Sequence, residues 1–476
     1  MRSPPAGARS GRSTGAGVGS GLGAGVRSAR DDGRRARCER HTFFRLRRRW
    51  RTVARCRTSV EEVPVLVGVL VGVGALVVAV LGVVLVRRLL RGRVLRVLAS
   101  VLVVVAVALV GTRAWAQVML DDAAAARAIA WREADTGDVH RFASHPVAAG
   151  DDRLVLRDAP LPPGALDGVR ARDGRTLDAL LADTGTAAFV VLRGSDVLVE
   201  EYGPGSAATT LQTSFSVAKS VLATVLGIAV DRGDVGSLDD PVTAYVPELA
   251  DRDPRFADVT LRHLVTMSSG LAYEEQGLPW SDDSVTYYSP DLRATALSAR
   301  VAQEPGRTFL YNNYNPLLVG LVLERATGRP LAEYTSEVLW QPLGAGADAS
   351  WSVDSVRHGF AKMESGFNAT ALDYARLGYL MAHEGAVDGR QVVSSTWVAQ
   401  ATAADTTTDP AARYQYFWWV DTERDGRFYG HGNHGQFVYV DPVTDVVVVR
   451  LGARYGVEPD AWVGVLREVA DAVAAS

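Results

Sequence analysis

The sequence is poor in cysteine, in lysine and, over most of its length, in positive charge. Its two cysteines, Cys38 and Cys56, lie near the N-terminus, so the rest of the chain has no disulfide and no thiolate metal ligand. Residues 1–60 carry 16 arginines against three acids, whereas residues 121–476 have a net charge of −20. An acidic main domain argues against nucleic acid as a partner, because phosphate binding needs clustered positive charge.

The N-terminal segment, residues 1–62, is rich in glycine, arginine and serine and shows little apolar periodicity. This composition predicts a disordered basic tail. Its basic region is too long for a signal peptide. Two interpretations stay open: an interaction tail, or a start codon assigned too early, with translation beginning near Val63. An N-terminal mass measurement on the native protein separates them.

Two long apolar runs follow the tail. Residues 63–86 contain no charge, and 24 residues are enough to cross a bilayer as a helix. The second run, Val97 to Val110, continues to Trp115, an aromatic residue suited to a membrane interface. The connection is basic and contains Arg87, Arg88, Arg91, Arg93 and Arg96.

We therefore predict a transmembrane hairpin over residues 63–116, in contact with membrane lipid. The positive-inside rule places its short loop in the cytoplasm and the main domain outside the cell membrane. The charge of residues 1–62 would favour the opposite topology. The alternative to a hairpin is a pair of buried helices in a soluble core.

The remaining chain has the pattern of a leading linker, residues 117–174, and one domain, residues 175–476. Residues 187–202 and 436–452 each resemble two strands joined by a turn. Helices are expected around residues 216–230, 317–326, 371–383 and 459–473. Strands early and late with helices between them predict an α+β fold, a mainly antiparallel sheet with a helical insertion.

One of only two lysines among 49 arginines, Lys219, follows Ser216 by three residues. The helix that they begin is apolar on nearly every face until Arg232-Gly233, so we expect it to be buried, with Thr213 or Ser214 as its cap. Burial and the helix dipole both disfavour a charged lysine and lower its pKa, as a general base requires. Arginine cannot lose its proton in this way. The alternative is a surface lysine beside a helix cap.

Two further segments could complete a site. Tyr311 and Asn313 lie in a polar turn before an apolar helix, where a tyrosine can relay protons and an asparagine can orient a substrate; the alternative is a solvent-facing loop. Residues 429–442 place a glycine-rich turn at the start of a strand, where backbone N–H groups can approach a substrate. His431 and His434 have the spacing of metal ligands, but no third ligand is suggested, so no metal is expected.

Ser-x-x-Lys, then Tyr-x-Asn, then a glycine-flanked third motif on a strand is the order found in β-lactamase-type serine hydrolases, and the chain resembles that family. The resemblance covers about residues 175–470. Within these residues the chain resembles above all class C-like esterases and 6-aminohexanoate-dimer hydrolases. It includes the segments LDDPVTAYVPEL (238–249), HLVTMSSGL (263–271), ERATGRPLAEYTSEVLWQPLGA (324–345), DYARLG (373–378) and YFWW (416–419).

The resemblance implies a role for each matching residue. It makes Ser216 the acylated nucleophile, Lys219 its base, Tyr311 the proton relay and Asn313 the asparagine of Tyr-x-Asn. The third motif falls on Gly430-His431-Gly432, and the N–H groups of Ser216 and Asn433 would form the oxyanion hole. Many relatives have Lys-Thr-Gly there, so the absent lysine weakens the case for β-lactam recognition, and His431 could supply only a partial, pH-dependent charge.

The sequence thus predicts a serine hydrolase without cofactor, acting on a small or short peptide-like ester or amide. A β-lactamase or D,D-peptidase and a non-catalytic penicillin-binding sensor are the alternatives. The natural substrate depends on loops such as residues 272–290, whose Trp280, Tyr287 and Tyr288 could line a pocket or pack the loop.

Overall fold

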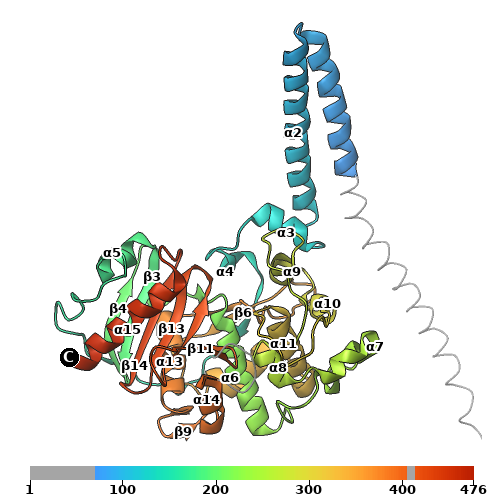
Figure 1. Cartoon of the computed structure of the whole chain (residues 1–476). Helices are drawn as coiled ribbons and strands as arrows, with labels where there is room; N and C mark the ends of the chain where they lie inside the picture. The colour runs from blue at the N-terminus through green and yellow to red at the C-terminus, as the bar shows by residue number, and fades with distance from the viewer. Residues whose placement is uncertain (1–69, 405–412) are drawn as a thin grey trace, which may run out of the picture. The chain divides into compact units, whose positions relative to one another are not determined.

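The structure, a computed structural model, describes residues 70–404 and 413–476 (Figure 1). The predicted disordered tail, residues 1–62, lies outside the described residues, as do residues 63–69 at the beginning of the predicted hairpin.

The larger sheet has eight strands in the order β10-β11-β12-β13-β14-β3-β4-β2. All neighbouring strands are antiparallel except β2 and β4, which are parallel. Both predicted hairpins are present, as β3–β4 and β13–β14. The strands are β2 (Arg157–Asp158), β3 (Thr186–Arg193), β4 (Asp196–Tyr202), β10 (Tyr414–Gln415), β11 (Trp418–Val420), β12 (Phe428–Gly432), β13 (Gln436–Asp441) and β14 (Val446–Gly452).

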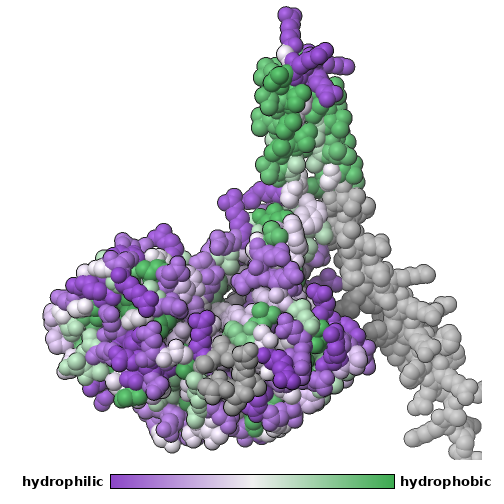
Figure 2. Space-filling view, viewed as in Figure 1, coloured by the Kyte–Doolittle hydropathy of each residue, from purple (hydrophilic) through white to green (hydrophobic). Residues whose placement is uncertain are grey.

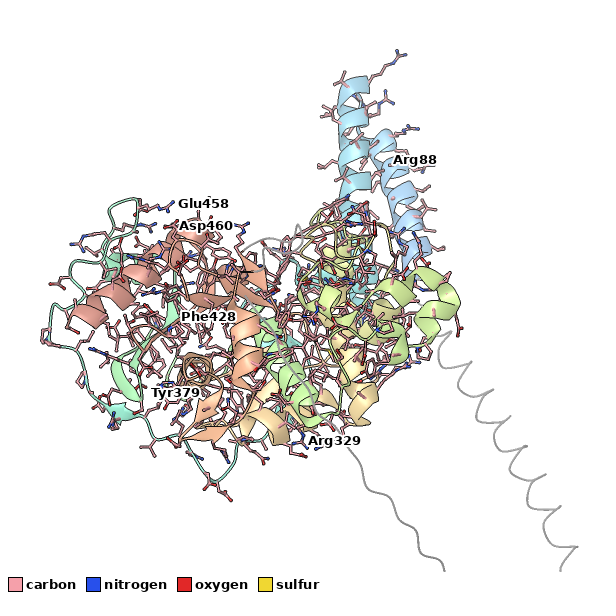
Figure 3. All side chains as sticks on the ribbon, turned by 60° about the horizontal axis from the view of Figure 1, so that its bottom comes forward. Arg88, Arg329, Tyr379, Phe428, Glu458 and Asp460 are labelled. Atoms are coloured by element: carbon pink, nitrogen blue, oxygen red, sulfur yellow. The ribbon has the colours of Figure 1, made fainter. Side chains whose placement is uncertain are left out.

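Helices cover both faces of this sheet, and successive residues of a strand point to opposite faces. In β3, Val190 and Leu192 join the core formed with α6 and α13, whereas Phe189 and Val191 join the core formed with α5 and α15. Burial on both faces explains why β14 begins with four consecutive valines. Residues at the edge of the domain are exposed instead, such as Glu458 and Asp460 at the start of α15, which Figure 3 labels. The covering helices are α5 (Leu177–Asp183), α6 (Val217–Arg232), α13 (Ala371–Ala382) and α15 (Pro459–Ala475).

A second sheet and a helical region complete the domain. The second sheet has the order β1-β6-β7-β5, with β1 (Ser144–Val147), β5 (Gln212–Thr213), β6 (Ala349–Ser352) and β7 (Phe367–Ala369); β8 (Ala386–Val387) pairs only with β9 (Arg390–Gln391). The helical region comprises α7 (Glu248–Arg252), α8 (Leu261–Val265), α9 (Asp282–Tyr288), α10 (Leu292–Leu297), α11 (Tyr314–Thr327) and α12 (Leu331–Thr335), with short helical turns at Val242–Ala244, Pro254–Asp258 and Ser336–Trp340. The remaining elements are α3 (Ala124–Trp131), α4 (Asp138–Arg141), α14 (Ser395–Thr402) and a turn at Asn433–Gly435. This is the predicted α+β fold, with sheets flanked by helices and a helical region.

Helix α6 starts differently from the prediction. Its N-cap residue is Ser216 itself, and the Ser216 side chain makes no capping hydrogen bond. Capping by Thr213 or Ser214 is therefore wrong, because Ser214 Oγ donates to the carbonyl oxygen of Phe367 in β7 at 2.8 Å. The contact ties the chain before α6 to the second sheet and leaves the Ser216 hydroxyl available. Gly233, with φ of 77°, ends the helix as expected.

Two apolar helices, Leu70–Leu89 and α2 (Arg93–Val118), precede the domain, and both are long and apolar enough to cross a membrane. Large apolar side chains are exposed along both, with Leu76 65% exposed and Leu109 67% exposed. Figure 2 shows the resulting hydrophobic surface over the two helices. The helices pack closely where glycine permits, since a Cβ atom on Gly111 would lie 2.7 Å from the Cβ of Ala75. These features are compatible with a membrane anchor.

Candidate active site

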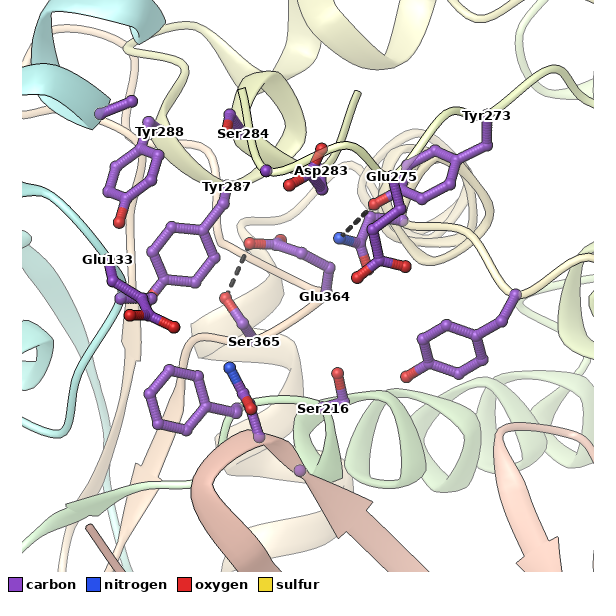
Figure 4. Close-up of a pocket in the computed structure, with 18 of the residues that line it drawn as sticks. Glu133, Ser216, Tyr273, Glu275, Asp283, Ser284, Tyr287, Tyr288, Glu364 and Ser365 are labelled. Atoms are coloured by element: carbon purple, nitrogen blue, oxygen red, sulfur yellow. Dashed lines mark hydrogen bonds between the residues drawn. The ribbon is translucent and has the colours of Figure 1, made fainter. Parts of the chain in front are cut away.

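Ser216 and Lys219 form a contact at the start of α6. The Lys219 Nζ atom lies 2.9 Å from the Ser216 Oγ atom and donates to the backbone carbonyl oxygen of Glu364 at 2.7 Å. Lys219 is 1% exposed, whereas Ser216 is only partly buried and projects into a pocket (Figure 4). The arrangement is that of a nucleophile with a base in hydrogen-bond reach.

Burial lowers the pKa of Lys219 to about 7. The neighbouring carboxylates of Glu364 and Glu275 oppose this shift, and the second lysine of the chain, Lys362, supports it. Near neutral pH a substantial fraction of Lys219 is therefore the free amine, which can accept a proton. The surface-lysine interpretation does not fit a side chain that is so deeply enclosed.

The residue before Ser216 holds a strained backbone conformation. Phe215 has φ of 46°, in the left-handed region that bulky side chains disfavour. Its ring packs against the imidazole of His434 at 5.1 Å between centroids. The sharp turn presents Ser216 between α6 and the end of β12.

Tyr311 also lies close to Lys219. The Lys219 Nζ atom is 5.0 Å from the centroid of the Tyr311 ring, which stacks on Trp419. Burial raises the pKa of Tyr311 well above its usual value, and an interaction of its hydroxyl with Ser216 opposes this shift only partly. The phenol therefore keeps its proton at neutral pH and can donate it.

Asn313 is held by two hydroxyl groups. Its Nδ2 atom donates to the Tyr273 hydroxyl at 3.0 Å and to Thr286 Oγ1 at 3.2 Å. Asn313 is the N-cap residue of α11 and lines the same pocket as Ser216. With the amide nitrogen engaged, the side-chain oxygen is the group left to meet a ligand.

Strand β12 runs against the start of α6. A Cβ atom on Gly432 would lie 2.1 Å from the carbonyl oxygen of Ser214 and 3.0 Å from the nitrogen of Ser216. Only glycine allows the two backbones to approach so closely. The turn that follows contains the exposed Asn433, so Asn433 and Ser216 border one pocket.

His431 is enclosed beside this turn. Its Nε2 atom lies 3.0 Å from the Tyr455 hydroxyl, and its ring stacks on Phe437. Burial lowers the pKa of His431 to about 4, so the expected partial charge on this residue is confined to acid pH. His434 is directed elsewhere, with Nε2 2.8 Å from the carbonyl oxygen of Ala134. Within residues 70–404 and 413–476, no group of three or more His, Cys, Asp and Glu side chains could hold a metal ion.

The pocket that joins these residues has a volume of about 710 Å³. Tyr287 and Tyr288, the last two residues of α9, line it, whereas Trp280 is 69% exposed. Four carboxylates and one guanidinium, that of Arg132, line the pocket. Figure 4 shows the carboxylates around Ser216: Glu133, Glu275, Asp283 and Glu364.

Two parts of the pocket lining were not predicted from the sequence. Ala128, Arg132, Glu133 and Ala134, in the segment predicted as a linker, line the pocket from α3 and the residues after it. The Tyr288 hydroxyl donates to the carbonyl oxygen of Arg132 at 2.6 Å. No sequence pattern marked this segment. Glu364 and Ser365 form the other part. The neighbouring Lys362 could have pointed to them, because it is as rare in this sequence as Lys219.

Comparison with known proteins gives a consistent result. A family profile described as Beta-lactamase matches residues 175–464. A protein of Paenarthrobacter ureafaciens named 6-aminohexanoate-dimer hydrolase is 32% identical over 313 residues, which cover 60% of this chain and 78% of that protein. Esterase EstB of Burkholderia gladioli is 32% identical over 188 residues, 36% of this chain and 47% of the esterase.

A solved structure is similar over most of the chain. It is that of a Bacillus anthracis protein described as a 6-aminohexanoate-dimer hydrolase, with a TM-score of 0.62 and 22% sequence identity. The similarity covers 75% of this chain and 95% of that one. It therefore supports the fold independently of the sequence motifs.

Proposed function

Because the chain belongs to the β-lactamase family of serine hydrolases, we propose that it cleaves an ester or amide bond through an acyl-enzyme formed on Ser216. The observation that carries the proposal is the 2.9 Å contact between Ser216 Oγ and a fully buried lysine amine. A pKa of about 7 for that lysine suits a base that works near neutral pH.

Acylation follows from this geometry. Ser216 Oγ attacks the carbonyl carbon while its proton passes to Lys219 Nζ, and the new C–O bond gives a tetrahedral oxyanion. The oxyanion collapses, the bond to the leaving group breaks, and the Tyr311 hydroxyl protonates the departing alcohol or amine. Tyr311 regains its proton from the Lys219 ammonium. Water then attacks the acyl-enzyme by the same route, and Ser216 is released.

Two backbone N–H groups would stabilise the oxyanion. We assign them to Ser216 and Asn433, because Gly432 brings the end of β12 against the first residue of α6. Asn313 would accept a hydrogen bond from the substrate through its side-chain oxygen, since its nitrogen is engaged by Tyr273 and Thr286. His431 and Gly432 would form the strand edge beside the acyl group.

The pocket favours substrates other than β-lactams. The third motif has no lysine, and His431 is neutral at physiological pH. Four carboxylates and one guanidinium line the pocket, so a substrate with a carboxylate next to its scissile bond would gain little electrostatic attraction. Two relatives are named as a 6-aminohexanoate-dimer hydrolase and an esterase. We therefore propose a small or short peptide-like ester or amide as substrate class, with β-lactamase or D,D-peptidase activity as the alternative.

A comparison of two chromogenic substrates tests this assignment. The full chain in detergent is expected to hydrolyse a p-nitrophenyl ester with a kcat/KM about 10- to 100-fold above that for a chromogenic cephalosporin, because the missing cation removes one charge-assisted hydrogen bond, worth about 1.5–3 kcal/mol. Comparable rates on both would favour a β-lactamase or D,D-peptidase. Stable labelling by penicillin without turnover of either substrate would favour a non-catalytic sensor.

We further propose that the two apolar helices anchor the enzyme in the cell membrane with the catalytic domain outside. The connection between them is basic, with Arg87, Arg88 and Arg91 beside the turn, as cytoplasmic loops are. A membrane-impermeant fluorophosphonate is then expected to label Ser216 on intact cells as completely as in lysed cells. Labelling only after lysis would reverse the orientation.

A further inference from the structure

The side-chain amines of both lysines of the chain contact the same residue, Glu364. The Lys219 Nζ atom donates to the Glu364 backbone carbonyl at 2.7 Å, and the Lys362 Nζ atom lies 2.9 Å from Glu364 Oε1. All three residues are 1% exposed. A chain with 49 arginines thus uses lysine only around one buried carboxylate.

The surroundings of Lys362 explain why arginine does not replace it. Its ammonium lies 4.0 Å from the centroid of the Tyr287 ring and 4.4 Å from that of Phe142, and it also donates to the carbonyl oxygen of Tyr287. A compact ammonium fits between two rings and two acceptors. A planar guanidinium would bring five donors into a space that satisfies fewer.

The Glu364 carbonyl belongs to a turn that this ion pair secures. The N–H groups of Ser365 and Gly366 both donate to the carbonyl oxygen of Lys362, at 3.1 and 2.7 Å, and Ser365 Oγ donates to Glu364 Oε1 at 2.7 Å. Glu364 Oε2 has no hydrogen-bond partner among the described residues. The Lys362 ammonium is in contact with the other carboxylate oxygen and balances the charge.

We propose that Lys362 and Glu364 are positioning residues for the base: their ion pair fixes the carbonyl that receives Lys219 and balances the charge beside it. The inference rests on the proposed function, in which Lys219 takes the proton of Ser216. Neither residue has to touch the substrate for this role.

The electrostatic part of the role has a definite sign. The Glu364 carboxylate favours the ammonium form of Lys219, and the Lys362 ammonium favours the free amine. Burial lowers the pKa of Lys362 itself; the contact with Glu364 and the charge of Asp138 favour its ammonium form, and Arg127 opposes it. The other groups that face Lys219 are Glu275, from the loop before α9, the neutral Tyr311 and the Ser216 hydroxyl. Removing one member of the pair therefore leaves a net charge next to the base.

The test is the acid limb of kcat/KM against pH for a p-nitrophenyl ester, measured on the full chain, since this limb reports the base of the free enzyme. Glu364→Gln is expected to move the limb about one unit to lower pH, and Lys362→Met about one unit to higher pH. The double variant is expected to return it to within about 0.3 units of wild type, because the charge is balanced again.

Two features make the outcome decisive. Gln is isosteric with Glu, so Glu364→Gln answers the question even if Lys362→Met does not fold; an unchanged limb would reduce the pair to a structural role and overturn the proposal. Equal shifts in the same direction would also overturn it. Glu275→Gln is the matched control: Glu275 is exposed, so its shift should disappear in high salt, whereas that of Glu364→Gln should persist. A wild-type enzyme without Ser216-dependent turnover would instead refute the proposed function itself.

Discussion

Replacing Ser216 by alanine is expected to lower ester hydrolysis by about 10⁴- to 10⁶-fold and to abolish covalent labelling by a fluorophosphonate. The loss follows because Ser216 Oγ is the one hydroxyl in contact with the Lys219 amine within the pocket wall that the structure describes. Turnover is measured with a p-nitrophenyl ester, and labelling by mass spectrometry of the Ser216 peptide.

The neighbouring Ser365 supplies a matched control. It lines the same pocket, and its Oγ donates to Glu364 rather than facing the base. Ser365→Ala should therefore keep the label on Ser216 and most of the activity. A Ser216→Ala enzyme that retains labelling would move the nucleophile elsewhere and refute the acyl-enzyme proposal.

Replacing Lys219 by arginine is expected to lower kcat/KM by about 10²- to 10⁴-fold, the usual contribution of a positioned general base. The substitution keeps the positive charge and removes basicity, because a guanidinium does not release its proton in proteins. For wild type, the pKa of about 7 predicts activity that rises with pH through about 7 as Lys219 becomes the free amine. The arginine variant should show no such rise.

The same pKa predicts what Lys219 does to stability. Its folded-state pKa lies below the unfolded value of about 10.4, so the unfolded chain binds more protons between these values. Lys219 therefore costs folding free energy below about pH 7, and this cost declines as the pH rises towards about 10.

Near-normal activity of Lys219→Arg would contradict the general-base role, and thermal unfolding of both proteins establishes that the variant is folded.

The features that the sequence predicted are those encoded by local patterns. Apolar runs on either side of a short turn located β3–β4 and β13–β14, because two such runs joined by turn residues are visible without knowledge of the other strands of the sheet. The run around α6, closed by Gly233, located the buried helix. The rarity of lysine singled out Lys219, since only a chemical requirement resists a strong preference for arginine.

Long-range contacts decided the rest. The cap of α6 was predicted at Thr213 or Ser214, but Ser214 bonds to Phe367, about 150 residues away in the sequence, and that contact cannot be read from a local pattern. His431 was expected to carry a pH-dependent charge, but its enclosure by Tyr455 and Phe437 keeps it neutral above acid pH. Burial of a side chain depends on which distant elements close over it.

The sequence alone therefore determined the family and the α+β architecture, and it singled out Ser216, Lys219, Tyr311 and Asn313, whose types and order carry the proposed chemistry. Only the tertiary structure decided how the base is held and what surrounds it. It brings residues 128–134 and the turn at Lys362 and Glu364 to the same pocket from segments more than 200 residues apart. The physical reason is that a pKa, unlike a motif, is set by desolvation and by charges that folding brings within a few ångströms.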